Sequence, residues 1–279
     1  MTIGQAILLG VAGLGAGIIA GLVGVGGGVI FTPVLFVAYG VLDVPADVRT
    51  PLTVGTGLFC TGLAAGASAL HHARRGAVDG RLALGVGGAS AAAVGLVSRF
   101  VVIQPWYSAA LFQVLFAAVL LVVVVRMVRG PVPETAPAGP NRRAPWGIGL
   151  GTGTAAGTVA AAVGVGGGVV LVPAYHRGLR LPMHRAVGTS SATIVCIAAL
   201  STIAYTWWGH GVAGRPGLAL GYVDIGTGLL LAGPAVVGAQ GGAALAHRID
   251  TTKLRWGFAA LALVVAGRLV WGALSGLAG

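Results

Sequence analysis

Two glycine-rich stretches of this chain have a composition and spacing suited to binding a small anion. Residues 24–29 are Gly-Val-Gly-Gly-Gly-Val, the same sequence recurs at 164–169, and a proline follows each stretch, at Pro33 and Pro173. Backbone that unwinds at glycines exposes N–H groups, and the start of the next helix adds the positive end of its dipole. Such a site needs no buried Lys or Arg. The candidate substrate-binding glycines are Gly26, Gly27, Gly28, Gly166, Gly167 and Gly168.

Two other interpretations of the glycine stretches exist. A nucleotide-binding loop is disfavoured, because no Lys-Ser/Thr pair follows either stretch and no strand precedes it. Close packing of membrane helices is the stronger alternative, since glycine lets two backbones approach each other. Two clusters in matching places of two halves, each beside a short broken segment, favour a transporter site near the middle of the bilayer.

Hydroxyl side chains near the glycines are candidates to complete the site. Thr32 follows the first cluster, and Thr189 and Ser190 begin a long apolar run in the second half. The first-half counterpart of that pair is the Thr-Pro-Leu-Thr stretch at 50–53, with the register between the two left open by a few residues. The alternative role for each hydroxyl is a hydrogen bond within or between helices.

Two acids occupy repeat-related positions. Asp79 and Asp224 each close a Gly-x-Val-Asp element, at 76–79 and 221–224, and each precedes an apolar run. They are expected either to cap the helix that follows or to bind a coupling proton inside the membrane.

The sequence shows no motif of catalytic or metal-binding residues. The histidines lie near segment ends without metal-ligand spacing, and Cys60 and Cys196 lie in apolar runs without a CxxC pair. No Ser/His/Asp arrangement is visible. We therefore expect no catalytic residue, no metal and no cofactor, and the protein is not expected to be an enzyme.

The elements that must position these residues are membrane helices. Of 279 residues, 56% are hydrophobic and only 8% are charged, far fewer than in a soluble domain. Charge-free runs at 50–73, 100–125 and 186–214 exceed the roughly 20 residues that span a bilayer. The expected fold is all-α and polytopic, because lipid accepts only helices or closed barrels. The net charge of +11 then indicates basic cytoplasmic loops and no nucleic-acid partner.

The glycine clusters divide the longest runs. The run 1–42 would form a helix of about 63 Å, twice the hydrocarbon core, so it is split into segments near 5–24 and 28–41. The second half divides into a segment at 146–165 and a short piece at 168–176, which is either re-entrant or a half-helix. Each half ends in a long helix, at 107–128 and 256–275. The expected organisation is a first repeat at 1–128, a cytoplasmic Pro-rich linker at 129–145 and a second repeat at 146–279.

Loop charges predict the topology. If each half holds an odd number of segments, most of the 17 Lys and Arg residues fall on one side of the membrane. The other side holds only Arg49, Arg99, Arg215 and Arg268. The basic side is expected to be cytoplasmic. An odd count also makes the two repeats inverted and places both termini on the non-cytoplasmic side.

These motifs together resemble the TauE/SafE family of sulfite-exporter-like permeases. The resemblance rests on the twin glycine stretches with their prolines, the segment 182–190 (Pro-Met-His-Arg-Ala-Val-Gly-Thr-Ser) and the two Gly-x-Val-Asp elements. The chain departs from its own second half at 48–51, Val-Arg-Thr-Pro, where substrate contacts could differ.

The resemblance implies a two-repeat helical bundle in the cytoplasmic membrane. It implies movement of sulfite, a sulfonate or a related sulfur-containing anion, mostly outward. The expected function is a secondary transporter working by alternating access, with the anion and the lipid bilayer as partners. A passive small-anion channel is the alternative, because it would use the same broken-helix chemistry.

Overall fold

The computed structural model describes residues 3–23, 27–128, 146–246 and 251–277. Gly26 and the predicted linker at 129–145 therefore lie outside the described residues.

The first half forms five α-helices among the described residues. The second of them is short and apolar, and a long helix follows it. Their bounds are α1 Ile3–Val23, α2 Gly28–Val41, α3 Ala46–Arg74, α4 Gly80–Val97 with its π-helical extension η1 Ser98–Val102, and α5 Ala109–Val128.

The second half repeats this order. Its helices are α6 Trp146–Val163, α7 Gly168–Pro173 with the π-helical η2 Ala174–Gly178, α8 Met183–Trp208, α9 Ile225–Ala246 and α10 Thr251–Leu277. A hairpin of β1 Ala219–Leu220 and β2 Val223–Asp224 precedes α9, with Ala219 opposite Asp224. The fold is thus helical, as expected from the sequence, with this one addition that the sequence did not predict.

The chain breaks where the glycines predict. Helix α2 begins at the last glycine of the first cluster, and α6 and α7 flank the second cluster. The terminal helix of the second half begins five residues earlier than expected, at Thr251 instead of 256. This difference reflects polar residues at its start, which hydropathy alone does not assign to a membrane helix.

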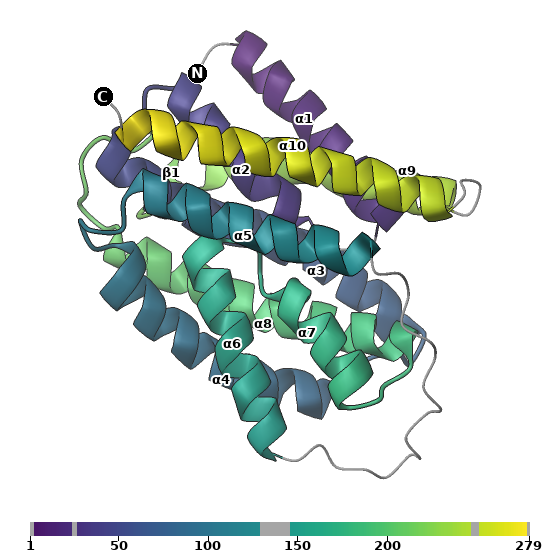
Figure 1. Ribbon diagram of the computed structural model, residues 1–279. Coiled ribbons are helices and arrows are strands. Elements are labelled where there is room, and N and C mark those ends of the chain that lie inside the picture. Colours follow the sequence, from purple (N-terminus) through teal and green to yellow (C-terminus); the bar gives the residue numbers. More distant parts are fainter. Residues whose placement is uncertain (1–2, 24–26, 129–145, 247–250, 278–279) are drawn as a thin grey trace.

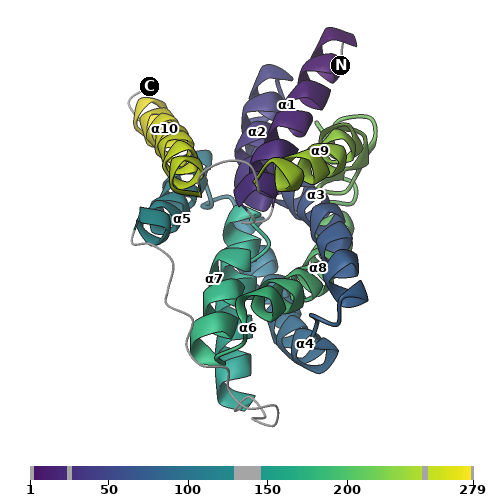
Figure 2. The same ribbon diagram turned by 90° about the vertical axis from the view of Figure 1, so that its right-hand side faces the viewer.

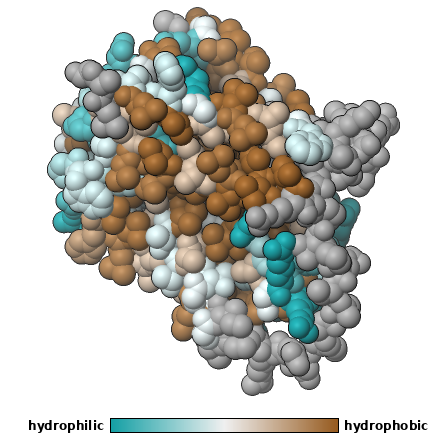
Figure 3. All heavy atoms as spheres, viewed as in Figure 1, coloured by the Kyte–Doolittle hydropathy of each residue, from teal (hydrophilic) through white to brown (hydrophobic). Residues whose placement is uncertain are grey.

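Four helices of the described residues are long and apolar enough to cross a membrane: Ala46–Arg74, Gly80–Val102, Ala109–Arg126 and Met183–Trp208. Shorter apolar helices accompany them, among them Gly28–Val41 and Ile225–Gln240. Much of the face seen in Figure 3 is hydrophobic, and large side chains such as Trp207 and Trp271 are more than 70% exposed. Such a surface suits lipid and not water, so the chain is a multi-pass membrane protein.

Each helix–helix contact described here has an equivalent in which the two halves exchange roles. Helix α1 packs along α9 and α6 along α4, while α2 packs on α3 and α7 on α8. The helices α3 and α8 pack on each other, and α5 lies beside α10 in both views (Figures 1 and 2). Every one of these contacts has a counterpart when the first five helices are exchanged with the last five.

The two central helices run antiparallel. A Cβ atom on Gly55 would lie 3.1 Å from the Cβ of Tyr205, and one on Gly62 would lie 2.7 Å from that of Ala198. Farther along, the hydroxyl of Ser68 lies 3.0 Å from that of Ser191. The residue numbers of the contacting partners thus increase along α3 and decrease along α8. Figure 1 also shows α5 and α10 running in opposite directions.

Glycines set the spacing of the outer helix pairs. On α1, a side chain at Gly13 or Gly17 would clash with the backbone carbonyl of Leu231 or Ala235 on α9. On α6, a side chain at Gly157 would clash in the same way with the backbone of α4. These contacts show the close approach of backbones that small residues allow in membrane helices.

Candidate functional site

Helix α2 begins at the first glycine cluster without a side-chain cap. Gly27 is its N-cap residue, and the Gly27 carbonyl accepts hydrogen bonds from the N–H groups of Ile30 and Phe31, at 3.0 and 2.9 Å. Gly28, the first residue of the helix, is buried. The amide groups of this first turn have no intrahelical partner, as at any helix start.

The second cluster has a backbone that requires glycine. Gly164, Gly166 and Gly167 have φ angles of 74, 76 and 78°, in the left-handed region. A residue with a Cβ atom is strained there. Gly167 is the N-cap of α7, which starts at Gly168, and its carbonyl accepts from the N–H of Leu171 at 3.0 Å.

The two breaks lie against each other in the middle of the molecule. The Thr32 hydroxyl, on α2, donates to the carbonyl of Gly164 at 3.0 Å. A Cβ atom on Gly28 would lie 2.6 Å from the carbonyl oxygen of Val165. Residues 27–32 and 164–166, far apart in the sequence, thus form one buried cluster.

Helix α3 supplies a wall of this cluster that the sequence analysis missed. The Thr61 hydroxyl would lie 2.6 Å from a Cβ atom on Gly28, and its methyl group would lie 2.6 Å from one on Gly166. Gly57, one turn earlier, would bring a Cβ atom within 2.8 Å of the Thr32 hydroxyl. Thr61 was overlooked because it stands inside a helix without a motif. The only signal for it is the i, i+4 spacing of Gly57 and Thr61 on one face.

Thr189 and Ser190 are placed elsewhere. The Thr189 hydroxyl accepts a hydrogen bond from the N–H of Asp79 at 3.0 Å. Ser191, next in the chain, contacts Ser68 on α3, about 10 Å along the helix from Thr61. The structure therefore brings Gly27, Gly28, Thr32 and Gly166 together and leaves the pair 189–190 nearer one end of the α3–α8 contact.

The sequence left open which residues at 50–53 correspond to Thr189 and Ser190. The structure defines this register. Pro45 and Pro182 precede α3 and α8 with nearly equal backbone angles, φ −52° and ψ 141° against φ −53° and ψ 144°. In this register Thr53 is the counterpart of Ser190. Both hydroxyls are buried and have no hydrogen-bond partner among the described residues, as is also true of Thr50.

Both repeat-related acids cap helices. An oxygen of Asp79 accepts from the N–H of Leu82 at 3.0 Å, and an oxygen of Asp224 accepts from the N–H of Thr227 at 3.1 Å. Their surroundings differ, because Asp79 is partly exposed while Asp224 is 1% exposed.

Basic side chains donate to backbone carbonyls. Arg126, in the last turn of α5, donates to the carbonyl of Val169, the last residue of the second glycine stretch. Arg49 donates to the carbonyl of Val44 at 3.0 Å, and Arg215 donates to that of Gly221 at 3.4 Å. The described residues contain no group of three side chains able to hold a metal ion. The cluster thus offers backbone N–H groups and hydroxyls, which suit an anion that must also be released.

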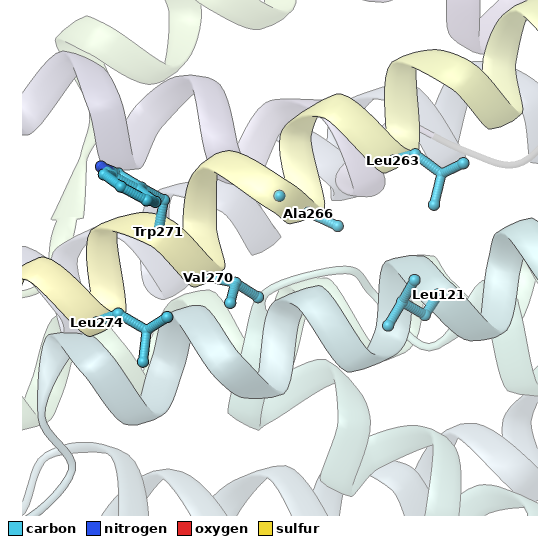
Figure 4. A pocket seen from close by; sticks show the side chains of 7 residues that line it. Leu121, Leu263, Ala266, Val270, Trp271 and Leu274 are labelled. Atoms are coloured by element: carbon cyan, nitrogen blue, oxygen red, sulfur yellow. The ribbon is translucent and has the colours of Figure 1, made fainter.

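A separate apolar groove lies between α5 and α10 (Figure 4). It is lined by Leu121, Leu263, Ala266, Gly267, Val270, Trp271 and Leu274. The lining carries no charged side chain, so the groove does not suit an anionic substrate.

Broken helices that meet inside a bundle of apolar helices are typical of membrane permeases. The comparison with protein families agrees, since the model described as sulfite exporter TauE/SafE matches residues 9–269. The chain belongs to the TauE/SafE family of sulfite-exporter-like membrane transporters. Comparisons with curated proteins and with solved structures give no match.

Proposed function

We propose that this protein is a secondary transporter that exports sulfite or a related small sulfur-containing anion across the cytoplasmic membrane. The observation that carries the proposal is the contact of Thr32 with Gly164, which joins the two broken segments into one neutral, buried cluster. Membership of the sulfite exporter family supports the substrate class. The sequence contains no ATP-binding motif, which favours an ion gradient as the driving force.

The proposed site binds the anion through neutral donors. The hydroxyls of Thr32 and Thr61 now donate to the carbonyls of Gly164 and Gly57, at 3.0 and 2.7 Å. A sulfur oxyanion can take over both hydrogen bonds, and bonds to a charged acceptor are stronger than those to a carbonyl. The amides of Gly27 and Gly28 add donors from the first turn of α2. Without a buried cation, the anion is not held too tightly to leave.

The proposed transport cycle uses the two halves as inverted repeats. Their packing is exchanged helix for helix, and α3 runs antiparallel to α8. Rocking of residues 1–128 against 146–279 would expose the glycine cluster to one side at a time, with 129–145 as the connecting linker. Thr189 and Ser190 would then line the path between the cluster and one side of the membrane.

The proposed orientation follows the basic residues. The antiparallel contact of α3 and α8 places Gly188 against His72, so Arg74, Arg75 and Arg185 belong to the same end of the molecule. The positive-inside rule assigns this end to the cytoplasm and both termini to the opposite side.

The direct test is uptake of radiolabelled sulfite into proteoliposomes containing the purified protein, with thiosulfate and taurine as competitors. We expect flux that saturates with sulfite and accumulates it against its gradient when an ion gradient is imposed. Flux that never saturates and follows only the membrane potential would identify a channel. Transport of a competitor without transport of sulfite would keep the permease and reject sulfite as its substrate.

A further inference from the structure

The two repeat-related acids look equivalent in the sequence but have different neighbours in the structure. We propose that Asp224 binds the proton that drives transport and that Asp79 is only a helix cap. The inference rests on the proposed function, since it names the coupling ion of the same transporter and the residue that carries it.

Three features establish which residues of α3 and α8 correspond. Pro45 matches Pro182, as described above, and the positive φ angles of Asp43 and Arg180, 52 and 53°, lie at the same distance before them. A tyrosine from each short helix also reaches matching threonines. The Tyr39 hydroxyl contacts that of Thr56 at 3.1 Å, and the Tyr175 hydroxyl contacts that of Thr193 at 2.9 Å.

When α3 and α8 are aligned in this way, the Gly-x-Val-Asp elements at 76–79 and 221–224 contact positions that differ by one helical turn. The N–H of Asp224 donates to the Thr56 hydroxyl at 2.9 Å. The N–H of Asp79 donates instead to the hydroxyl of Thr189, four residues before Thr193, the counterpart of Thr56. Asp224, from the second half, therefore reaches the tyrosine–threonine contact of the first half. Asp79, from the first half, stops about 6 Å short of the equivalent contact in the second half.

Glycines hold the two elements in these different positions. The carbonyl of Tyr222 lies so close to Gly55 that a Cβ atom there would clash, and the carbonyl of Ala77 meets Gly188 in the same way. The counterpart of Gly188 on α3 is Pro51, and the counterpart of Gly55 on α8 is Ala192. Both counterparts carry a Cβ atom, so neither element can move to the other's docking position without meeting a side chain. The difference between the docking positions of Asp79 and Asp224 therefore follows from the residue types at these four positions.

The result is a carboxylate enclosed by neutral groups. One oxygen of Asp224 accepts from the N–H of Thr227, and the other lies 3.5 Å from the Tyr39 hydroxyl. Among the residues that the structure describes, the titratable side chains that face it are Tyr39 from α2 and Cys60 from α3. Acids in such positions within a membrane are commonly proton carriers.

Helix α2 connects this acid to the substrate site. Thr32 and Tyr39 are seven residues apart on α2, so both project from the same face of one helix. When the oxygen facing Tyr39 takes up a proton, the hydrogen bond reverses, because a protonated carboxyl donates and the phenolic oxygen accepts. The tyrosine proton then goes to Thr56 alone, and the charge-assisted bond to the carboxylate is lost. Helix α2, which begins at the glycine cluster, is held less strongly at Tyr39.

The test compares Asp224→Asn with Asp79→Asn in proteoliposomes. Asparagine caps a helix as well as aspartate does but does not titrate, so each variant keeps its cap. We expect Asp224→Asn to retain sulfite exchange and to lose stimulation of net flux by a pH gradient. Asp79→Asn should respond to the gradient as the wild type does. Equal loss in both variants, or a full pH response in Asp224→Asn, overturns the proposal.

The tyrosines offer a second matched pair. Tyr39→Phe should weaken the pH response, because it removes the group that senses the charge on Asp224, whereas Tyr175→Phe should not. A result in which both variants behave alike contradicts the asymmetry.

A substrate-free measurement separates this inference from the proposed function. Infrared difference spectra of the purified protein between acid and neutral pH should show a buried carboxylic C=O band. We expect the band in the wild type and in Asp79→Asn, and its loss in Asp224→Asn. A band that persists in Asp224→Asn rejects the proton site even if sulfite is not the substrate.

Discussion

Thr32 and Ser190, both proposed to contact the transported anion, are buried hydroxyls with different hydrogen bonding. The Thr32 hydroxyl is satisfied by the carbonyl of Gly164, while the Ser190 hydroxyl has no partner although the residue is 1% exposed. An unsatisfied buried hydroxyl costs about 1–3 kcal/mol of stability. In the proposed cycle, the passing anion would accept a hydrogen bond from Ser190.

Two substitutions test this difference. Thr32→Val should lower the free energy of unfolding by about 1 kcal/mol and raise the KM for the anion, because it removes a satisfied bond and a donor to substrate. Ser190→Ala should leave stability unchanged or raised and still slow transport. The measurements are thermal unfolding in detergent and sulfite flux. Ser201, whose hydroxyl donates to the carbonyl of Ile197, provides a control as Ser201→Ala, for which normal flux is expected.

The left-handed glycines of the second cluster are a further residue-scale test. Gly166→Ala should destabilise the protein by about 1–3 kcal/mol, because its φ is 76° and its Cβ would lie 2.6 Å from the methyl group of Thr61. Gly151→Ala on α6 has open space around it and should gain about 0.5–1 kcal/mol from better helix propensity. Unfolding temperatures of the two variants should move in opposite directions. A shift of both in the same direction would argue against backbone strain at Gly166.

At the scale of elements, the proposed site is formed by the two broken segments together. Gly27→Val combined with Gly167→Val should abolish transport while the protein still inserts into the membrane. Valine at Gly27 would press on the ring of Phe31, and at Gly167 it would meet the carbonyl of Ala156 at 2.8 Å with an unfavourable φ. Flux and membrane fractionation are the two measurements.

The control for that double variant is Gly10→Val with Gly147→Val. Both glycines lie on helices with no atom near a new Cβ, so normal flux is expected. Unchanged flux in the Gly27/Gly167 variant would remove the glycine cluster from the transport path.

At the scale of the whole molecule, the distribution of basic residues predicts orientation. Arg74, Arg75 and Arg185 share one end of the α3–α8 pair, whereas Arg49 belongs to the other end. An alkaline phosphatase fused to the C-terminus should be active, because that terminus is expected outside the cytoplasm. The same fusion placed within residues 129–145 should be inactive. The reverse pattern would invert the molecule and exchange the sides of Asp224 and Asp79.

Much of the fold was predictable because its signals are local. Apolar runs marked the helices, and the glycine clusters marked the breaks between α1 and α2 and between α6 and α7. The hairpin before α9 was not predicted, since two-residue strands leave no periodic pattern. Of the hydroxyls chosen from sequence, Thr32 joins the glycine cluster, whereas Thr61 and Tyr39 lacked any motif that could single them out.

What the sequence alone determined is the class of the protein and the places where its helices break. Both follow from hydropathy and from glycine, which act on a few neighbouring residues at a time. Only the tertiary structure decided which groups meet. It joined Thr32 to Gly164, and it brought Asp224, but not Asp79, within hydrogen-bonding distance of a tyrosine. The positions of Gly55 and Gly188 set how far each acidic element reaches along the helix on which it docks. Contacts of this kind depend on close approach between helices distant in the chain, which no local pattern records.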